Sequence, residues 1–230
     1  MAAAGLPRAR EQRIAATPPG VYRYRIRGAV SIEGQRRRPL GRGMEIRVSA
    51  PRRSGDLTCI RVQHYFPGMA SATTTVGLLG GRAFLLGADT RLAAAGLRPL
   101  RIDLHQSRPL LIGDLDSVSA SLAYTGTATG ETEYATFSAP VVGRYAYEVV
   151  GLRRLRIGSR RLTALGIEQR AALESEDVTA TQRGISWLST ARQLILAEDV
   201  EQSITAGSRT VRTTYRSVLR STRPGVCCSP

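Results

Sequence analysis

The sequence contains no lysine, so arginine supplies all 33 of its basic side chains. A lysine is essential to a P-loop phosphate site and to Schiff-base chemistry, and both are therefore excluded. The two histidines are too few for a three-histidine metal site. The nucleophile motif Gly-x-Ser-x-Gly is also missing. We expect a protein that is not an enzyme and that binds neither a metal nor a cofactor.

Cysteine is scarce as well, and three cysteines are too few for a disulfide framework. Cys59 lies in a strand-like segment, whereas Cys227 and Cys228 lie near the end of the chain. A bridge between Cys59 and one of the other two is one interpretation. Three free thiols is the favoured one, because adjacent cysteines rarely bridge each other without strain.

Long apolar runs are absent too. No run reaches the roughly 20 residues that a membrane-spanning helix needs, and the start of the chain lacks the apolar core of a signal peptide. At 230 residues with 42% hydrophobic content, the chain can still bury a core. We expect residues 1–19 to form a disordered leader, residues 20–222 a single all-β domain and residues 223–230 a disordered tail.

The charge is one-sided, with a formal net value of +15, which raises the question of an anionic partner. Most arginines are scattered at alternate positions of strand-like segments, where a solvated sheet face explains them. Binding of a polyanion or nucleic acid through an arginine-rich surface is the alternative function, with nucleic acid disfavoured as the partner. An anionic membrane surface is a further candidate partner. The oligomeric state is left open.

What the sequence does contain is an unbroken alternation through Val21–Ile32. Tyr22, Tyr24 and Ile26 fall on one side of an extended chain, and three arginines fall on the other. Such a strand cannot bury its aromatic face alone. The pattern therefore predicts a sheet that curves around something apolar, either its own core or a bound ligand.

Similar alternation recurs along most of the chain, with turn residues between the segments. One short helix is expected at Asp89–Gly96, because Asp89 can cap it and Gly96 can end it. Leu97–Asp116 is expected to be mostly loop with short extended pieces, since two Arg-Pro pairs interrupt it. The predicted fold class is all-β: a strongly curved antiparallel sheet, half-barrel-like, built from two meanders with one short helix. The other expected strands are Met44–Val48, Leu57–Phe66, Thr73–Leu79, Arg82–Leu86, Ser117–Thr127, Tyr134–Phe137, Thr163–Leu173, Val178–Leu188, Leu194–Ile204 and Arg209–Ser221.

An internal repeat supports the two meanders. Gly143–Gly151 repeats the pattern of Gly20–Gly28, and the same spacing places Trp187 opposite His64. We interpret this as an internal duplication whose two halves, residues 20–140 and residues 143–222, have diverged in sequence.

Few side chains could carry chemistry. His64 could serve as a base, but on an apolar strand face a packed core histidine is the ordinary interpretation. Asp103 and His105 suit a base held by a carboxylate, yet no nucleophile motif accompanies them. Acidic pairs such as Glu198 and Asp199 are expected at turns, where solvation explains them.

Strands at both ends and in the middle of the chain turn aromatic side chains to one side, and few helices are available to cover them. We expect a non-catalytic binding or carrier protein for an apolar ligand, with a lipid favoured, held on the concave face of the sheet under the Asp89–Gly96 helix as a lid. If the same side chains only pack against each other, the protein is a structural or interaction module. The expected ligand-binding residues are Tyr22, Tyr24, Ile26, Met44, Ile46, Tyr145, Tyr147, Trp187 and Tyr215.

Three segments carry a resemblance to known proteins. Pro19–Gly28, Gly184–Ser189 and Thr214–Pro224 resemble segments of uncharacterised secreted or membrane-anchored actinobacterial proteins. More broadly, the chain is distantly similar to lipoprotein carriers and mycobacterial lipid-carrier lipoproteins, whose half-barrels hold acyl chains. The resemblance implies an extracytoplasmic location, secreted or in the cell envelope, and a lipid ligand. The chain departs from the pattern in lacking an export signal and a lipobox cysteine near its start.

Overall fold

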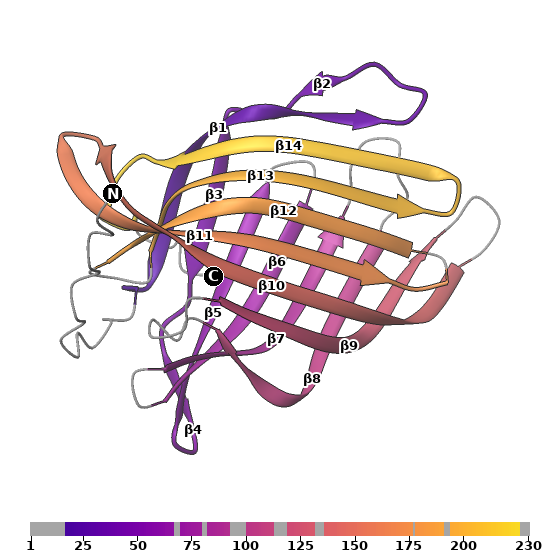
Figure 1. Cartoon of the computed structure of the whole chain (residues 1–230), viewed down its shortest axis with the longest axis horizontal. Helices are drawn as coiled ribbons and strands as arrows, with labels where there is room; N and C mark the ends of the chain where they lie inside the picture. The colour runs from indigo at the N-terminus through magenta and orange to yellow at the C-terminus, as the bar shows by residue number, and fades with distance from the viewer. Residues whose placement is uncertain are drawn as a thin grey trace, which may run out of the picture.

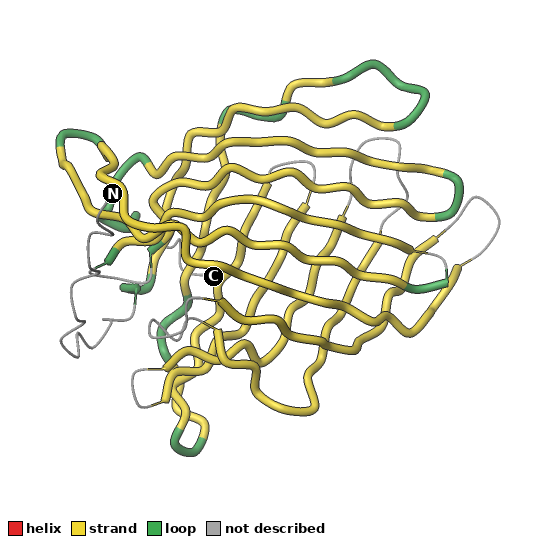
Figure 2. Tube along the Cα trace, viewed as in Figure 1, coloured by secondary structure: helices red, strands yellow, loops and turns green. Residues whose placement is uncertain are grey.

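The computed structural model describes residues 17–66, 70–79, 82–92, 100–112, 119–131, 136–176, 178–190 and 194–225. Within these ranges the regular structure is strand, and no helix occurs, as Figure 2 shows. The strands form one antiparallel sheet curled into a half-barrel, which confirms the predicted fold class apart from its helix. They are β1 Gly20–Ile32, β2 Arg38–Pro39, β3 Gly43–Val48, β4 Arg52–Ser54, β5 Leu57–Phe66, β6 Ala70–Leu79, β7 Arg82–Leu92, β8 Leu100–Ile112, β9 Ser119–Glu131, β10 Thr136–Ile157, β11 Arg160–Glu174, β12 Val178–Ser189, β13 Ile195–Ala206 and β14 Arg209–Leu219.

The two ends of this sheet meet, because β1 pairs with β3 on one side and with β14 on the other. Tyr24, for example, lies between Met44 of β3 and Leu219 of β14. In Figure 1, β10–β14 form one wall and β5–β9 form a second wall behind it, with strands that cross the first at a steep angle. We call the side of each wall that faces the other wall the inner face.

Alternation along β1 determines which side chains point to the inner face. Tyr22 and Tyr24 are 0% exposed, whereas Arg23 and Arg25, one position away, are exposed to solvent. This is the expected behaviour of a strand with one buried face, because successive side chains point to opposite sides. Paired positions on neighbouring strands share a face, so the register extends the assignment across the sheet.

A dense apolar core fills one end of the inner face. Tyr24 and Leu196 are 0% exposed, and Leu219 is 2% exposed. The Tyr24 hydroxyl donates a hydrogen bond of 2.8 Å to the carbonyl oxygen of Ile195, which ties β1 to the start of β13. Other members of this buried cluster are Tyr22, Ile26, Met44, Ile46, Val48, Ile60, Ile157, Ala164 and Leu194.

Glycine permits two close backbone approaches in the sheet. A Cβ atom at Gly28 would lie 2.2 Å from the carbonyl oxygen of Thr214, and one at Gly184 would lie 2.3 Å from the carbonyl oxygen of Asp199. Backbone atoms cannot rotate away as a flexible side chain can. Glycine is therefore required at both positions, where strands approach their neighbours closely.

The hairpin of β10 and β11 extends past the other strands. A β-bulge between Val149 and Gly151 precedes this extension. Leu155 and Leu162 pack against the core cluster, so the extension is part of the folded domain. Its turn reaches β14, because a Cβ atom on Gly158 would lie 3.8 Å from the carbonyl oxygen of Arg220.

The structure corrects the predicted helix at Asp89–Gly96. Asp89–Leu92 belongs to β7, and residues 93–96 lie outside the described residues. Asp89 pairs with Thr73 of β6 and with Asp103 of β8, so hydrogen-bonded neighbours on both sides override the local helical pattern.

Two further predictions are corrected in the same way. Leu100–Ile112, expected to be mostly loop, is strand β8. Glu198 and Asp199, expected at a turn, lie in the middle of β13. In both segments, pairing with neighbouring strands decides the conformation.

Both ends of the described chain are held against β1. Val21 and Gly225 exchange two backbone hydrogen bonds, of 3.2 and 2.8 Å. The Tyr22 hydroxyl donates to the carbonyl oxygen of Pro18 at 2.8 Å. The expected domain limits and the proposed duplication stay predictions. Among the residues described, no helix is long and apolar enough to span a membrane.

Candidate functional site

A group of polar side chains crosses the inner face of β10–β14. The register places Ser186 beside Glu198, and Glu198 beside Ser217, in one row across three strands. The next positions along the strands bring Gln169 and Tyr215 into the adjacent row. We call this group the polar belt; it consists of Tyr145, Gln169, Ser186, Glu198, Tyr215 and Ser217.

Glu198 is the buried acid of the polar belt and is 4% exposed. One of its carboxylate oxygens accepts hydrogen bonds from the Ser217 hydroxyl at 3.3 Å and from the Tyr215 hydroxyl at 3.5 Å. Burial raises the pKa of Glu198 from 4.5 to about 7, and the two hydroxyls offset only part of this effect. Near neutral pH, Glu198 is therefore present both as an acid that can donate a hydrogen bond and as a carboxylate that can only accept.

The phenol beside Glu198 remains protonated at physiological pH. Burial raises the pKa of Tyr215 well above 10, and the negative charge of Glu198 adds to the increase. Tyr215 is thus a stable hydrogen-bond donor to the carboxylate. Its ring also contacts Phe66 of β5 in an edge-to-face arrangement, with ring centroids 5.2 Å apart, so this pair connects the two walls.

The other half of the polar belt is a chain of hydrogen bonds. The Tyr145 hydroxyl donates to Oε1 of Gln169 at 3.1 Å, and Nε2 of Gln169 donates to the Ser186 hydroxyl at 3.1 Å. Ser186 is buried, whereas Tyr145 and Gln169 are only half-buried. The belt thus offers polar groups at two depths, with Glu198 and Ser186 buried and Tyr145 and Gln169 partly accessible.

Small side chains occupy the facing wall. The register with the inner positions of β5 assigns five alanine and threonine positions of β6 and β7 to the inner face. All five are half-buried rather than fully buried. These positions are thus less completely buried than the packed core at the end of the inner face. These positions are Ala70, Ala72, Thr74, Ala88 and Thr90.

The residues expected to bind a ligand fall into two groups. Those of β1 and β3 are at most 5% exposed and belong to the packed core. Tyr147 is 6% exposed, and Tyr145 and Tyr215 are half-buried in the polar belt. Ligand contact stays a prediction for both groups. The core group is Tyr22, Tyr24, Ile26, Met44 and Ile46.

Trp187, the last expected ligand-binding residue, lies on the opposite side of β12 from Ser186. The Arg153 guanidinium lies over its indole ring, 5.6 Å from the ring centroid. A Cβ atom on Gly166 would lie 2.8 Å from the same ring, so that glycine provides the space for it. Trp187 is half-buried, and it packs against the core cluster.

The two histidines do not complete a catalytic group in the described part of the chain. His64 lies on the inner face between Ile46 and Ala72, and burial lowers its pKa to about 4. Among the described residues it has no hydrogen-bonded carboxylate. The side chain of His105 is outside the described residues, and Asp103 lies 3.4 Å from Arg101.

Among the described residues, Ser217 and Cys59 also lack a catalytic setting. Ser217 is 0% exposed, so a substrate cannot reach its hydroxyl. Cys59 is a free, half-buried thiol, and Cys227 and Cys228 lie outside the described residues. In the described ranges, no group of three or more His, Cys, Asp or Glu side chains could hold a metal ion. The arrangement of the polar belt is suited to hydrogen bonding.

No protein-family model matches the chain, and no curated protein matches it. Solved structures with a similar course include the hypothetical lipoprotein YmcC of Escherichia coli K12, with 14% identity over 83% of this chain and 86% of that one, at a TM-score of 0.34. A protein of Parabacteroides distasonis named as a lipoprotein has 8% identity over 91% and 97% of the two chains, at a TM-score of 0.35. A protein of Bacteroides fragilis, named as exported and as having a YmcC-like fold, has 9% identity over 90% and 96%, at a TM-score of 0.33. Because all three TM-scores are below 0.5, no function is carried over from these proteins.

Proposed function

We propose that this protein is a non-catalytic binding or carrier protein for an amphipathic ligand, a lipid, held between the two walls of the sheet. The observation that supports the proposal is the contrast along the inner face. One end is a packed core, whereas the middle combines small, half-buried side chains on β6 and β7 with the polar belt on β10–β14. A ligand in this middle region would cover surface that the described side chains leave accessible to solvent.

The polar belt would determine the orientation of the ligand. Both hydrogen bonds to Glu198 are accepted by its Oε2, so among the described residues its Oε1 has none. A buried oxygen without a polar partner costs free energy, so Glu198 favours a ligand group that can donate to Oε1. Tyr145 and Gln169, which are half-buried, are accessible to the same group. An acyl chain would lie toward Ala72 and Ala88 on the opposite wall, where the side chains are small and half-buried.

The rival assignment is a structural or interaction module in which no ligand enters. Native mass spectrometry of protein purified from its own host, followed by lipid extraction, distinguishes the two. We expect a co-purifying lipid at up to one molecule per chain. Absence of any bound lipid, together with failure to bind a dansyl-labelled undecanoic acid probe, would overturn the proposal.

A pair of variants locates the site. Ala72→Phe adds a large ring to the inner face of β6, whereas Thr73→Phe adds the same ring to the outer face of the same strand. We expect the first to abolish probe binding and the second to leave it unchanged, with both variants folded by circular dichroism. Equal binding by both variants would place the probe elsewhere. The extracytoplasmic location that accompanies this proposal is tested by fractionating the host's cells.

A further inference from the structure

The outward faces of β1 and β14 bring arginines together at adjacent positions. β1 contributes its alternate outward positions, and the register places Arg27 directly opposite Arg216. Next to them, the backbone N–H of Arg220 donates to the carbonyl oxygen of Arg23. All these side chains are exposed. We call this surface the basic face; it consists of Arg23, Arg25, Arg27, Arg37, Arg212, Arg216 and Arg220.

Like charges directly opposite each other on neighbouring strands are unfavourable, so such pairs are normally offset by acidic neighbours. Elsewhere on the sheet, acidic neighbours do offset the arginines: Arg183 forms an ion pair with Glu201, and Arg101 forms ion pairs with Asp89 and Asp103. In the described residues, Arg25, Arg27, Arg212 and Arg220 form no ion pair. The basic face is therefore a concentration of uncompensated positive charge.

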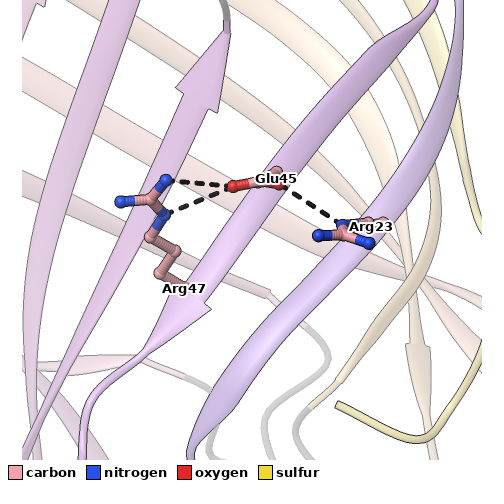
Figure 3. A network of polar contacts seen from close by, with 3 residues as sticks. All are labelled: Arg23, Glu45 and Arg47. Atoms are coloured by element: carbon pink, nitrogen blue, oxygen red, sulfur yellow. Dashed lines mark hydrogen bonds and ion pairs between the residues drawn. The ribbon is translucent and has the colours of Figure 1, made fainter. Parts of the chain in front are cut away.

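Two acidic groups beside the basic face, Glu45 and Asp199, are already engaged. Glu45 lies between two arginines, 3.4 Å from Nε of Arg23 and 3.1 Å from Nη2 of Arg47, as Figure 3 shows. Asp199 is 3.7 Å from Arg216. Each carboxylate neutralises at most one arginine, so the positive charge persists in solution.

The basic face continues onto a neighbouring element. The turn of the β10–β11 hairpin lies next to the backbone of Arg220, and Arg156, Arg160 and Arg161 around it are exposed. In Figure 1 this turn lies beside the end of β14. The positive surface thus extends over parts of β1 and β14 and onto a hairpin tip, much further than a single small anion could occupy.

We propose that the basic face docks the protein on an anionic lipid membrane. A broad, shallow array of arginines suits a surface of many phosphate headgroups, to which each guanidinium contributes separately. Polynucleotides are a weaker match. Base-binding surfaces combine positive charge with aromatic platforms, and the outward positions of β1 and β14 carry no aromatic side chain among the described residues. This proposal does not depend on a ligand in the interior.

The test is co-sedimentation with vesicles of phosphatidylglycerol and phosphatidylcholine, with pure phosphatidylcholine vesicles as the neutral reference. The test variant carries Arg25→Gln, Arg27→Gln, Arg212→Gln and Arg216→Gln. The control variant loses the same charge from other strands, through Arg101→Gln, Arg144→Gln, Arg170→Gln and Arg183→Gln. Each arginine near an anionic surface contributes roughly fivefold to partitioning. We therefore expect the test variant to bind anionic vesicles at least about 100-fold more weakly than wild type, and the control less than about 10-fold more weakly.

Three results would overturn the proposal. An equal loss of vesicle binding in the test and control variants would mean that net charge alone drives binding. Unchanged binding by the test variant would remove the basic face from the interaction. Tighter binding of wild type to a single-stranded oligonucleotide than to anionic vesicles, at equal phosphate concentration and lost in the test variant, would assign the face to polynucleotides. Circular dichroism and thermal unfolding check folding, and relief of the Arg27–Arg216 repulsion should leave the test variant at least as stable as wild type.

Discussion

Replacing Glu198 with glutamine should change how stability depends on pH. The pKa of Glu198 is about 7 in the folded protein against 4.5 for a solvated glutamate. Because the folded-state pKa is raised, the stability associated with the protonated side chain is fully present below pH 4.5 and is lost as pH rises through 7. A tenfold change in an acid dissociation constant corresponds to about 1.4 kcal/mol, so the loss amounts to about 3 kcal/mol.

Glu198→Gln removes this titration but keeps an oxygen that can accept from Ser217 and Tyr215. In urea unfolding, we expect the free energy of unfolding of the variant to rise by about 3 kcal/mol relative to that of wild type as the pH is raised from 4.5 to 8. Subtracting the free energy of unfolding of wild type from that of the variant at each pH cancels the contribution of every other titrating group. A gain of about 3 kcal/mol is large against the roughly 5–15 kcal/mol typical of a domain, so it lies well above the error of the measurement.

Glu201→Gln is the matched control, because Glu201 is on the same strand but exposed and paired with Arg183. Exposed pairs contribute at most about 1 kcal/mol, so its curve should stay near that of wild type. If the difference between wild type and Glu198→Gln is the same at pH 5 and pH 8, the reasoning is refuted. Glu198 would then ionise as freely as a solvated group, which would mean that water reaches the polar belt.

Three other predictions concern the fold and the inner face. His64→Gln should show the opposite pH dependence. The pKa of His64 is about 4 in the folded protein against 6.5 for a solvated histidine, so wild type loses stability relative to the variant as pH falls from 6.5 to 4. Urea unfolding of both proteins at pH 4 and pH 7 measures this difference. Gly28→Ala should destabilise by about 1–3 kcal/mol or prevent folding, whereas Gly41→Ala, with nothing within 4 Å, should be nearly neutral in thermal unfolding. Tyr24→Phe should cost about 1–3 kcal/mol in urea unfolding, because it leaves the carbonyl group of Ile195 without its donor; an unchanged midpoint would contradict this.

Much of the fold could be predicted because one face of each strand is buried. Because buried and exposed side chains alternate along a strand, apolar and polar residues alternate in the sequence. This pattern predicted the bounds of β1, β5 and β11–β14 to within a few residues. The helix at Asp89–Gly96 failed for a different reason. Its cap and stop residues express a local preference, whereas β7 is held by pairing with β6 and β8, which no local pattern records.

The polar belt was missed although a signal was present. Leu196, Glu198 and Val200 alternate within β13, so the same rule that placed Tyr24 inside also places Glu198 inside. Acidic residues are usually solvated, and that expectation assigned Glu198 to a turn. Its hydrogen-bond partners, Ser217 and Tyr215, come from the next strand, and only the register between strands brings them together.

The pairing of β1 with β14 has a consequence for synthesis of the chain. Tyr24 pairs with Leu219, so the first strand leaves the ribosome almost the whole chain ahead of its partner. At typical translation rates of about 5–20 residues per second, the interval is on the order of 10–40 s. During that time β1 presents a strand edge and its two tyrosine side chains to other nascent chains. Successful biogenesis therefore requires either a chaperone that covers β1 or a delay in folding until the last strand is made.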